Sequence, residues 1–83
     1  MKTKNIQPIN EKGEPHGYWE YYWGNGQLHY KGNYVNGKQH GYWECYYSNG
    51  QLDYKGNFVN DNAHGYWEEY HYNGQLKEKT YYI

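Results

Sequence analysis

The chain has 83 residues, a formal net charge of −1 and eight basic residues, all of them lysine. This near-neutral balance excludes the strongly basic surface that nucleic-acid and anionic-membrane binders use, and no apolar run reaches the length of a membrane span. A single cysteine, Cys45, excludes an internal disulfide. We therefore expect one domain, with neither nucleic acid nor membrane as its partner.

Residues 1–15 form an N-terminal extension that reads MKTKNIQPINEKGEP. It carries charge but lacks the apolar segment of a secretion signal, so we expect a cytoplasmic protein. Pro8, Pro15 and the polar run 10–14 predict a loop, and residues 4–7 predict a short strand against the first repeat. The abundance of Lys, Asn, Tyr and Ile is typical of an AT-rich coding sequence, which indicates a bacterial or phage source.

From residue 16 onward the chain is a repeat with a period of 24 residues. The middle copy, 40–63, reads HGYWECYYSNGQLDYKGNFVNDNA; the first copy is 16–39, and the last, 64–83, stops four residues short. A period of this length is typical of repeat architectures rather than of one globular core. We expect a repeat domain over 16–83.

Each unit contains two strand-like stretches joined by turn residues. Asn-Gly pairs lie at 25–26, 49–50 and 73–74 within the units, and Asn36-Gly37 and Asn60-Asp61 lie between them. Asn-Gly is the strongest short-range signal of a β-hairpin with a type I′ turn. The pattern predicts an all-β fold, a single meandering antiparallel sheet of about six strands built from three hairpins, over residues 17–23, 27–35, 41–47, 51–59, 65–71 and 75–82.

Two-residue loops at these pairs would set the register of the sheet. Trp19 would face Gly32, and Glu20 would face Lys31. The same rule predicts the pairs Tyr21–Tyr30, Trp23–Leu28, Trp43–Gly56, Glu44–Lys55, Cys45–Tyr54 and Glu68–Lys79 within hairpins, and Tyr30–Trp43 and Tyr54–Trp67 between them. The rings of Trp19 and Trp43 would cover the strand glycines that they face, Gly32 and Gly56.

All six strands would then share two faces of opposite character. We call one the aromatic face; it is predicted to carry Trp19, Tyr21, Trp23, Leu28, Tyr30, Tyr34, Trp43, Tyr47, Leu52, Tyr54, Phe58 and Trp67. We call the other the ladder face; it is predicted to carry Glu20, Lys31, Glu44, Lys55, Glu68 and Lys79, flanked by Tyr18, Tyr42 and Tyr66. Alternating charges on adjacent strands favour ion pairs across the ladder face.

The third unit departs from this pattern on the aromatic face. Glu69, His71, Glu78 and Thr80 stand where the second unit has Cys45, Tyr47, Tyr54 and Gly56. Charged residues that point inward near an edge strand discourage the addition of further strands. We interpret the third unit as a C-terminal cap of the array.

The run from Gly41 to Gly56, G-Y-W-E-x-Y-x-x-N-G-Q-L-x-x-K-G, resembles the bacterial variant of the MORN repeat. The resemblance covers about residues 16–83 and weakens in the second half of the third unit. It implies a meandering antiparallel sheet with one hairpin per repeat, and a role in protein interaction, self-association or scaffolding. Some bacterial members are antitoxin components. The family pattern brings no catalytic residues.

Three groups of residues suggest chemistry and are better explained by structure. His16, His40 and His64 begin the three units, but equivalent positions lie two strands, roughly 10 Å, apart, too far for one metal. Three equivalent Glu–Lys pairs are unlike an active site, which is a single constellation in a pocket. Cys45 has no cationic neighbour that would activate its thiol. We expect no enzyme, metal or cofactor.

The aromatic face is the feature with functional promise. Nothing in the sequence supplies a second layer to cover it, and exposed Tyr and Trp are the usual anchors of interfaces. The predicted partner-binding residues are Trp19, Tyr21, Trp23, Tyr30, Tyr34, Trp43, Tyr47, Tyr54, Phe58 and Trp67. The structural alternative is a curved sheet whose rings cover one another.

The leading hypothesis is a protein-interaction module, such as an antitoxin or small inhibitor that blocks a partner protein through the aromatic face or an edge strand. Self-association into a homodimer is compatible with it. The alternative is a carbohydrate- or choline-binding aromatic repeat, since regularly spaced rings suit sugar stacking and cation–π capture.

Overall fold

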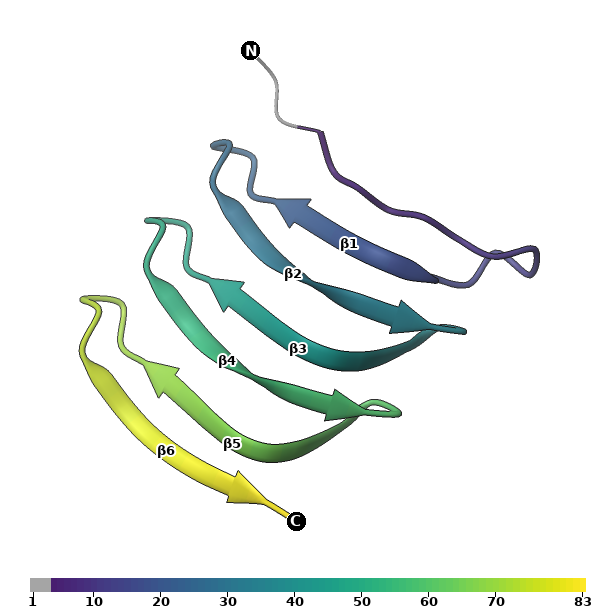
Figure 1. The fold of residues 1–83 in the computed structure, drawn as a ribbon. Coiled ribbons are helices and arrows are strands. Elements are labelled where there is room, and N and C mark those ends of the chain that lie inside the picture. The colour runs from purple at the N-terminus through teal and green to yellow at the C-terminus, as the bar shows by residue number, and fades with distance from the viewer. Residues whose placement is uncertain (1–3) are drawn as a thin grey trace.

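The computed structural model describes residues 4–83, so residues 1–3 of the predicted extension lie outside the described residues. These residues form one antiparallel sheet in which each strand pairs with the next along the chain (Figure 1). The strands are β1 (Gly17–Tyr22), β2 (Leu28–Val35), β3 (Lys38–Tyr46), β4 (Leu52–Val59), β5 (Asn62–Tyr70) and β6 (Leu76–Tyr82). The predicted all-β meander of six strands is confirmed, and no helix occurs within 4–83.

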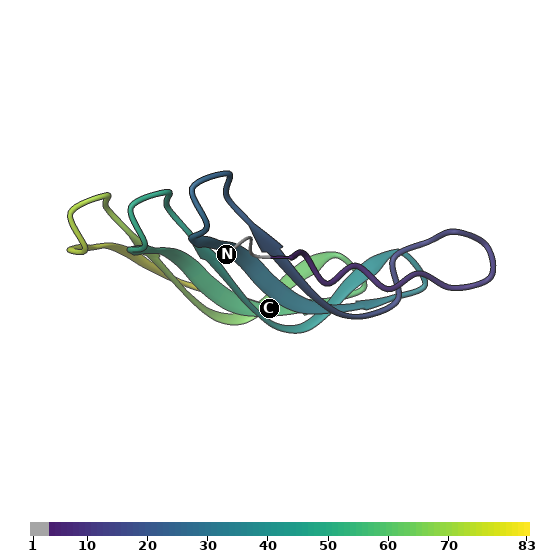
Figure 2. The ribbon, with the colours of Figure 1, turned by 90° about the horizontal axis from the view of Figure 1, so that it is seen from above.

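The sheet is a single layer. Its extents are 40 × 40 × 11 Å, and the view along the sheet shows no second layer on either side (Figure 2). In the same view, the turns that close the three hairpins rise on one side of the sheet, parallel to one another. Both faces of the sheet are therefore open to solvent or to a partner.

The turns between repeats adopt the predicted conformation. Asn36 and Gly37 have φ values of 49° and 84°, and Asn60 and Asp61 have values of 49° and 69°. Positive φ at both central positions defines a type I′ turn, and Asn and Asp are the residues after Gly that best tolerate it. Pairing resumes directly after these tight loops, so β3 and β5 begin at Lys38 and Asn62, three residues earlier than predicted.

The turns within repeats are longer than predicted. Trp23 N–H donates to the Gln27 carbonyl at 2.7 Å, and Gly26 N–H donates to the Trp23 carbonyl at 2.9 Å, which encloses a three-residue loop. Only Gly26, with φ 90°, is left-handed there, the geometry of a turn followed by a glycine bulge. The prediction of a two-residue loop is wrong, and the second and third hairpins repeat the longer one.

A bulge next to this loop restores most of the predicted register. Tyr22 pairs with Leu28 while Tyr21 pairs with Tyr30, so His29 is an extra residue. The pairs Trp19–Gly32, Tyr21–Tyr30, Glu20–Lys31, Trp43–Gly56, Cys45–Tyr54, Glu44–Lys55 and Glu68–Lys79 are confirmed. The pair Trp23–Leu28 is wrong. Leu28 and Leu52 pair with Tyr22 and Tyr46 and so lie on the ladder face, because directly opposed residues share a face.

A second irregularity separates each hairpin from the next. Asn33 pairs with His40 and Lys31 pairs with Glu44, so three residues of β3 lie opposite Gly32 alone. Tyr30 therefore pairs with Cys45 instead of the predicted Trp43, and Tyr54 likewise pairs with Glu69 instead of Trp67. Two extra residues preserve the alternation of side chains, so the assignment of tryptophans and ladder residues to opposite faces survives.

This irregularity determines which glycine each tryptophan covers. A Cβ atom placed on Gly32 would lie 2.2 Å from the ring of Trp43, and one on Gly56 would lie 2.2 Å from the ring of Trp67. The predicted covering of Gly32 by Trp19 and of Gly56 by Trp43 is therefore wrong. Each ring packs back over the last strand of the preceding repeat, which has no side chain at that point.

The N-terminal segment lies beside β1, along the outer edge of the sheet (Figure 1). Ile6 and Glu20 exchange two backbone hydrogen bonds of 2.8 and 3.0 Å, and the indole N–H of Trp19 donates to the Pro8 carbonyl at 2.8 Å. The strand expected over 4–7 is thus an isolated bridge at Ile6. The Pro8 carbonyl accepts the hydrogen bond from the Trp19 indole. Trp43 and Trp67 donate the equivalent hydrogen bonds to the carbonyls of Asn33 and Asn57 in the preceding repeat.

Candidate interaction faces

Three of the four tryptophans, Trp19, Trp43 and Trp67, form the core of the aromatic face. Trp19, Trp43 and Trp67 expose only 9, 2 and 8% of their surface, although nothing covers the sheet. Trp43 shows how this is achieved: it lies over Gly32, stacks on Tyr30 at 5.6 Å and meets Tyr34 edge-on at 5.0 Å. Offset and edge-on ring pairs of this kind are favourable. The rings bury one another, as the structural alternative anticipated.

The accessible part of the aromatic face consists of the rings around the tryptophans. Tyr21, Tyr30, Tyr34, Tyr54 and Phe58 are half-buried, and Tyr21 stacks on Tyr30 with centroids 5.3 Å apart. A shallow, open hollow lies among them, and its walls are Tyr30, Tyr34, Gln39, Trp43 and Tyr54. Of the predicted partner-binding residues, these five rings are half-buried and accessible to a partner, as are Trp23 and Tyr47.

Trp23 and Tyr47 lie apart from this cluster, at the turn end of the hairpins. The indole N–H of Trp23 donates to the Tyr46 carbonyl at 3.1 Å, and the Tyr47 hydroxyl donates to the Tyr70 carbonyl at 2.7 Å. His29, the bulge residue, stacks on Trp23 at 3.7 Å; its burial lowers the pKa of the imidazole. These two predicted site residues therefore join successive turns to one another.

The C-terminal side of the aromatic face is polar. Glu69 and Glu78 are directly opposed across β5 and β6. Near the centre, Cys45 is buried, and its burial raises the pKa of the thiol. A buried thiol of raised pKa is a packed, unreactive side chain.

On the ladder face, tyrosine hydroxyls hold the glutamates in place. Tyr18 and Tyr22 each donate to Glu20 at 2.7 Å, and Tyr42 and Tyr46 donate to Glu44 in the same way. The hydrogen bonds from Tyr22 and Tyr18 lower the pKa of Glu20, opposed by a weaker effect of burial. Because hydrogen bonds to a carboxylate favour its charged form, Glu20 stays ionised near neutral pH.

The lysines of the ladder bridge from one repeat to the next. Lys31 Nζ lies 3.3 Å from Glu44, and Lys55 Nζ lies 3.4 Å from Glu68. Lys79 Nζ lies 3.8 Å from Glu68, which belongs to the same repeat. These lysines are more than a third exposed, so each pair stabilises the sheet only weakly.

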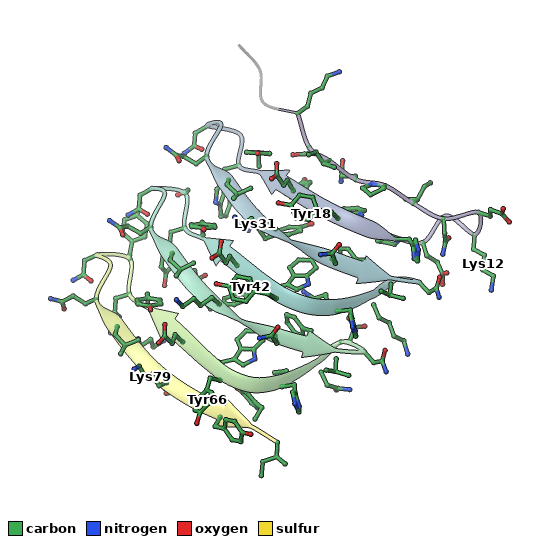
Figure 3. All side chains as sticks on the ribbon, in the orientation of Figure 1. Lys12, Tyr18, Lys31, Tyr42, Tyr66 and Lys79 are labelled. Carbon is green, nitrogen blue, oxygen red and sulfur yellow. The ribbon has the colours of Figure 1, made fainter. Side chains whose placement is uncertain are left out.

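The ladder face also carries a row of exposed tyrosines, which the residue pattern placed there without assigning them a role. Tyr18, Tyr42 and Tyr66 occupy equivalent positions on β1, β3 and β5 and succeed one another across the sheet (Figure 3). They expose 41, 47 and 79% of their surface, far more than the tryptophans. The sequence did contain a signal for this row: each tyrosine lies two residues before a ladder glutamate and therefore shares its face.

The part of the chain that the structure describes has neither a cluster of metal ligands nor a helix that could cross a membrane. No three of its His, Cys, Asp and Glu side chains gather as metal ligands would. His16 instead accepts a hydrogen bond at Nδ1 from Asn36 N–H at 3.0 Å. No helix long and apolar enough to cross a membrane occurs within 4–83.

Comparison with protein families identifies the class of repeat. The model of the MORN repeat variant matches residues 15–36, 39–60 and 63–83, which is most of the chain. The chain therefore belongs to the MORN repeat variant family, as the GYWE and NGQL motifs predicted. Comparison with curated proteins and with solved structures gave no match. MORN repeats are generally non-catalytic modules for interaction with proteins or lipids.

Proposed function

We propose that this chain is a non-enzymatic protein-binding module. The observation that carries the proposal is the single layer: a sheet 11 Å thick leaves both of its faces uncovered. Domains ordinarily bury a sheet face against a second layer, and a partner is the natural second layer here. The narrower role is that of an antitoxin or small inhibitor in the cytoplasm, which blocks the protein that it covers.

The contact surface on the aromatic face is the half-buried set Tyr30, Tyr34, Tyr54 and Phe58, of which the three tyrosines line the shallow hollow. These rings are rigid because they pack on the buried tryptophans, so little conformational entropy is lost when a partner covers them. The tryptophans support this surface from below and do not themselves form the contact.

The test is affinity purification from the source cell, with the intact chain as bait and mass spectrometry as the readout. Phe58→Glu places a charge on the aromatic face without removing a buried tryptophan, and Lys31→Glu is the matched control on the ladder face. We expect the partner to be lost with Phe58→Glu and kept with Lys31→Glu. A partner retained by both variants, which must also keep the β-sheet spectrum of the parent, contradicts binding through the aromatic face.

A further inference from the structure

The tyrosine row on the ladder face, Tyr18, Tyr42 and Tyr66, repeats with the period of the fold. Glu20 pairs with Lys31 and Lys31 pairs with Glu44, so equivalent residues of consecutive repeats are two strands apart, at right angles to the strands. Neighbouring strands lie about 4.8 Å apart, which separates consecutive tyrosines of the row by about 9.6 Å. A row of identical side chains at a constant spacing suits a ligand whose own groups repeat at the same spacing.

The polyproline II helix has nearly this repeat. It has three residues per turn and a rise of about 3.1 Å per residue, which gives one turn in about 9.3 Å. Proline-rich segments in this conformation are recognised by exposed aromatic rings that hold the prolines. We propose that the tyrosine row is a docking surface for a proline-rich protein segment, with one tyrosine for each turn. The proposal rests on the proposed function only in that the partner is a protein.

The tyrosine side chains are already ordered in the free protein. The hydroxyls of Tyr18 and Tyr42 donate to Glu20 and Glu44 at 2.7 and 2.8 Å, which holds the rings in one orientation while 41 and 47% of the two residues' surface stays exposed. Tyr66 differs: it packs on the exposed Tyr81 with centroids 4.7 Å apart. Side chains that are already ordered lose little entropy on binding.

Hydrogen-bond donors lie between the tyrosines. Asn33 and Asn57 are the cross-strand partners of Tyr18 and Tyr42, share their face and are exposed. A polyproline II helix has no internal hydrogen bonds, so its carbonyl groups need donors, and a side-chain amide supplies two N–H groups. Asn33 and Asn57 therefore receive the carbonyls of a segment whose prolines lie on Tyr18 and Tyr42.

Charge on this face favours an uncharged ligand. Glu20, Glu44 and Glu68 alternate with Lys31, Lys55 and Lys79 across the sheet. A strand of nucleic acid, which also stacks on aromatic rows, needs a positively charged track along its phosphates. The alternation provides no such track, whereas a proline-rich segment requires none.

The experiment measures binding of synthetic peptides to the full chain by titration calorimetry and by chemical-shift changes. One peptide carries proline at every third position over nine residues, and the other has the same composition with proline at every fourth position. We expect the first to bind at least about tenfold more tightly, because only it places a proline on each tyrosine. Equal affinities, or no binding of either peptide, would overturn the proposal.

Variants locate the binding surface. Tyr42→Ala is expected to weaken binding about tenfold and Asn33→Ala about threefold. The matched control is Tyr46→Phe. Tyr46 also donates a hydrogen bond to Glu44 but is not part of the tyrosine row, so this variant is expected to bind as the parent does. Loss of binding with Tyr46→Phe alone, or binding of a neutral β-linked oligosaccharide in place of the peptides, would contradict the assignment.

The two proposals fail separately. If the cellular partner is lost with Phe58→Glu and kept with Tyr42→Ala, and the peptides do not bind, the protein-binding role stands and the proline-rich ligand is wrong. If the peptides bind the tyrosine row while Phe58→Glu keeps every partner, the contact belongs to the ladder face instead of the aromatic face.

Discussion

The second and third repeats share the HGYWE and NGQL motifs but differ in their second strands. Strand β4 of the second repeat offers Gly56 to the ring of Trp67 and stacks Tyr54 on it at 5.5 Å. Strand β6 of the third repeat has Thr80 and Glu78 at these positions, and almost all of it is exposed. The difference shows that the first and second repeats are each completed by the tryptophan of the next repeat, whereas the third has no glycine at the equivalent position.

The N-terminal end of the array meets the same requirement in the opposite way. Trp19 has no preceding repeat, and the extension supplies the missing acceptor through the Pro8 carbonyl. The residues of this extension from Lys4 to Ile9 are exposed, so its cover is thinner than a full strand. The centre of the array is therefore well packed, and its two ends differ: the N-terminal extension covers one, and the exposed strand β6 forms the other.

The largest expected effect is the loss of the central tryptophan. Trp43→Ala removes the most buried ring and should lower the free energy of unfolding by about 3–5 kcal/mol. Trp19→Ala, at the thinly covered end, should cost about half as much. Urea denaturation followed by circular dichroism measures both. Equal losses would show that the centre is no better packed than the N-terminal end.

Substitution by alanine should destabilise the sheet at Gly56, which Trp67 covers, and should have little effect at Thr80, the equivalent position of the third repeat. Gly56→Ala places a Cβ about where the ring of Trp67 lies and should cost about 1–3 kcal/mol. Thr80→Ala is the matched change at the equivalent position of the third repeat. It should alter the free energy of unfolding by no more than about 0.5 kcal/mol. Similar costs in denaturation would refute the pairing of each glycine with the next tryptophan.

Alkaline pH should weaken the tyrosine–glutamate contacts of the first two repeats. Burial and then the hydrogen bonds to Glu20 and Glu44 raise the pKa values of Tyr18 and Tyr46 to about 12, above the usual 10.0. The unfolded chain therefore releases these protons first, so the stabilisation is complete below pH 10 and is lost as the pH rises through about 12. Denaturation midpoints measured against pH, with tyrosinate absorbance as the titration signal, check this.

The matched variant for the alkaline effect is Tyr46→Phe, which removes one titrating hydroxyl. It should make the decline in stability above pH 10 shallower, and it should lower stability at neutral pH by about 1–2 kcal/mol because the hydrogen bond to Glu44 is lost. A decline that begins well below pH 10 would show that the tyrosines are not the groups responsible.

The smallest expected effect is a gain from making the third repeat resemble the second. Glu78→Tyr removes the like charge that faces Glu69 and provides a ring at the position of Tyr54. We expect a gain of about 0.5–1 kcal/mol, seen as a higher denaturation midpoint. The control Lys77→Ala, one residue earlier on β6, should be neutral. A loss of stability in Glu78→Tyr would mean that the opposed carboxylates are themselves stabilising.

Much of the fold was predictable because side chains alternate strictly along a strand. The ladder pairs Glu20–Lys31 and Glu44–Lys55 needed only turns at the right places and an even number of extra residues. The loop at 24–26 is one residue longer than predicted, and the bulge at His29 compensates for it. Local signals marked the turn, but its hydrogen-bonding pattern depends on the neighbouring bulge.

The candidate site was predicted less completely. Three of the four tryptophans chosen as contacts, Trp19, Trp43 and Trp67, are buried, because rings from neighbouring strands meet around them. Tyr18 and Tyr42 were placed beside the charge ladder, but their exposure of 41 and 47% did not follow from the residue pattern. Exposure is a property of several strands together and cannot be assigned from a residue's position in one repeat.

The 24-residue period by itself determined the number of strands, the order in which they pair and the two faces of the sheet, since these depend on turn residues and alternation within each unit. Only the tertiary structure decided that each tryptophan covers the glycine of the preceding repeat. The reason is that three residues of one strand oppose a single residue of its neighbour, and Gly41, with φ 82°, turns Trp43 back over Gly32.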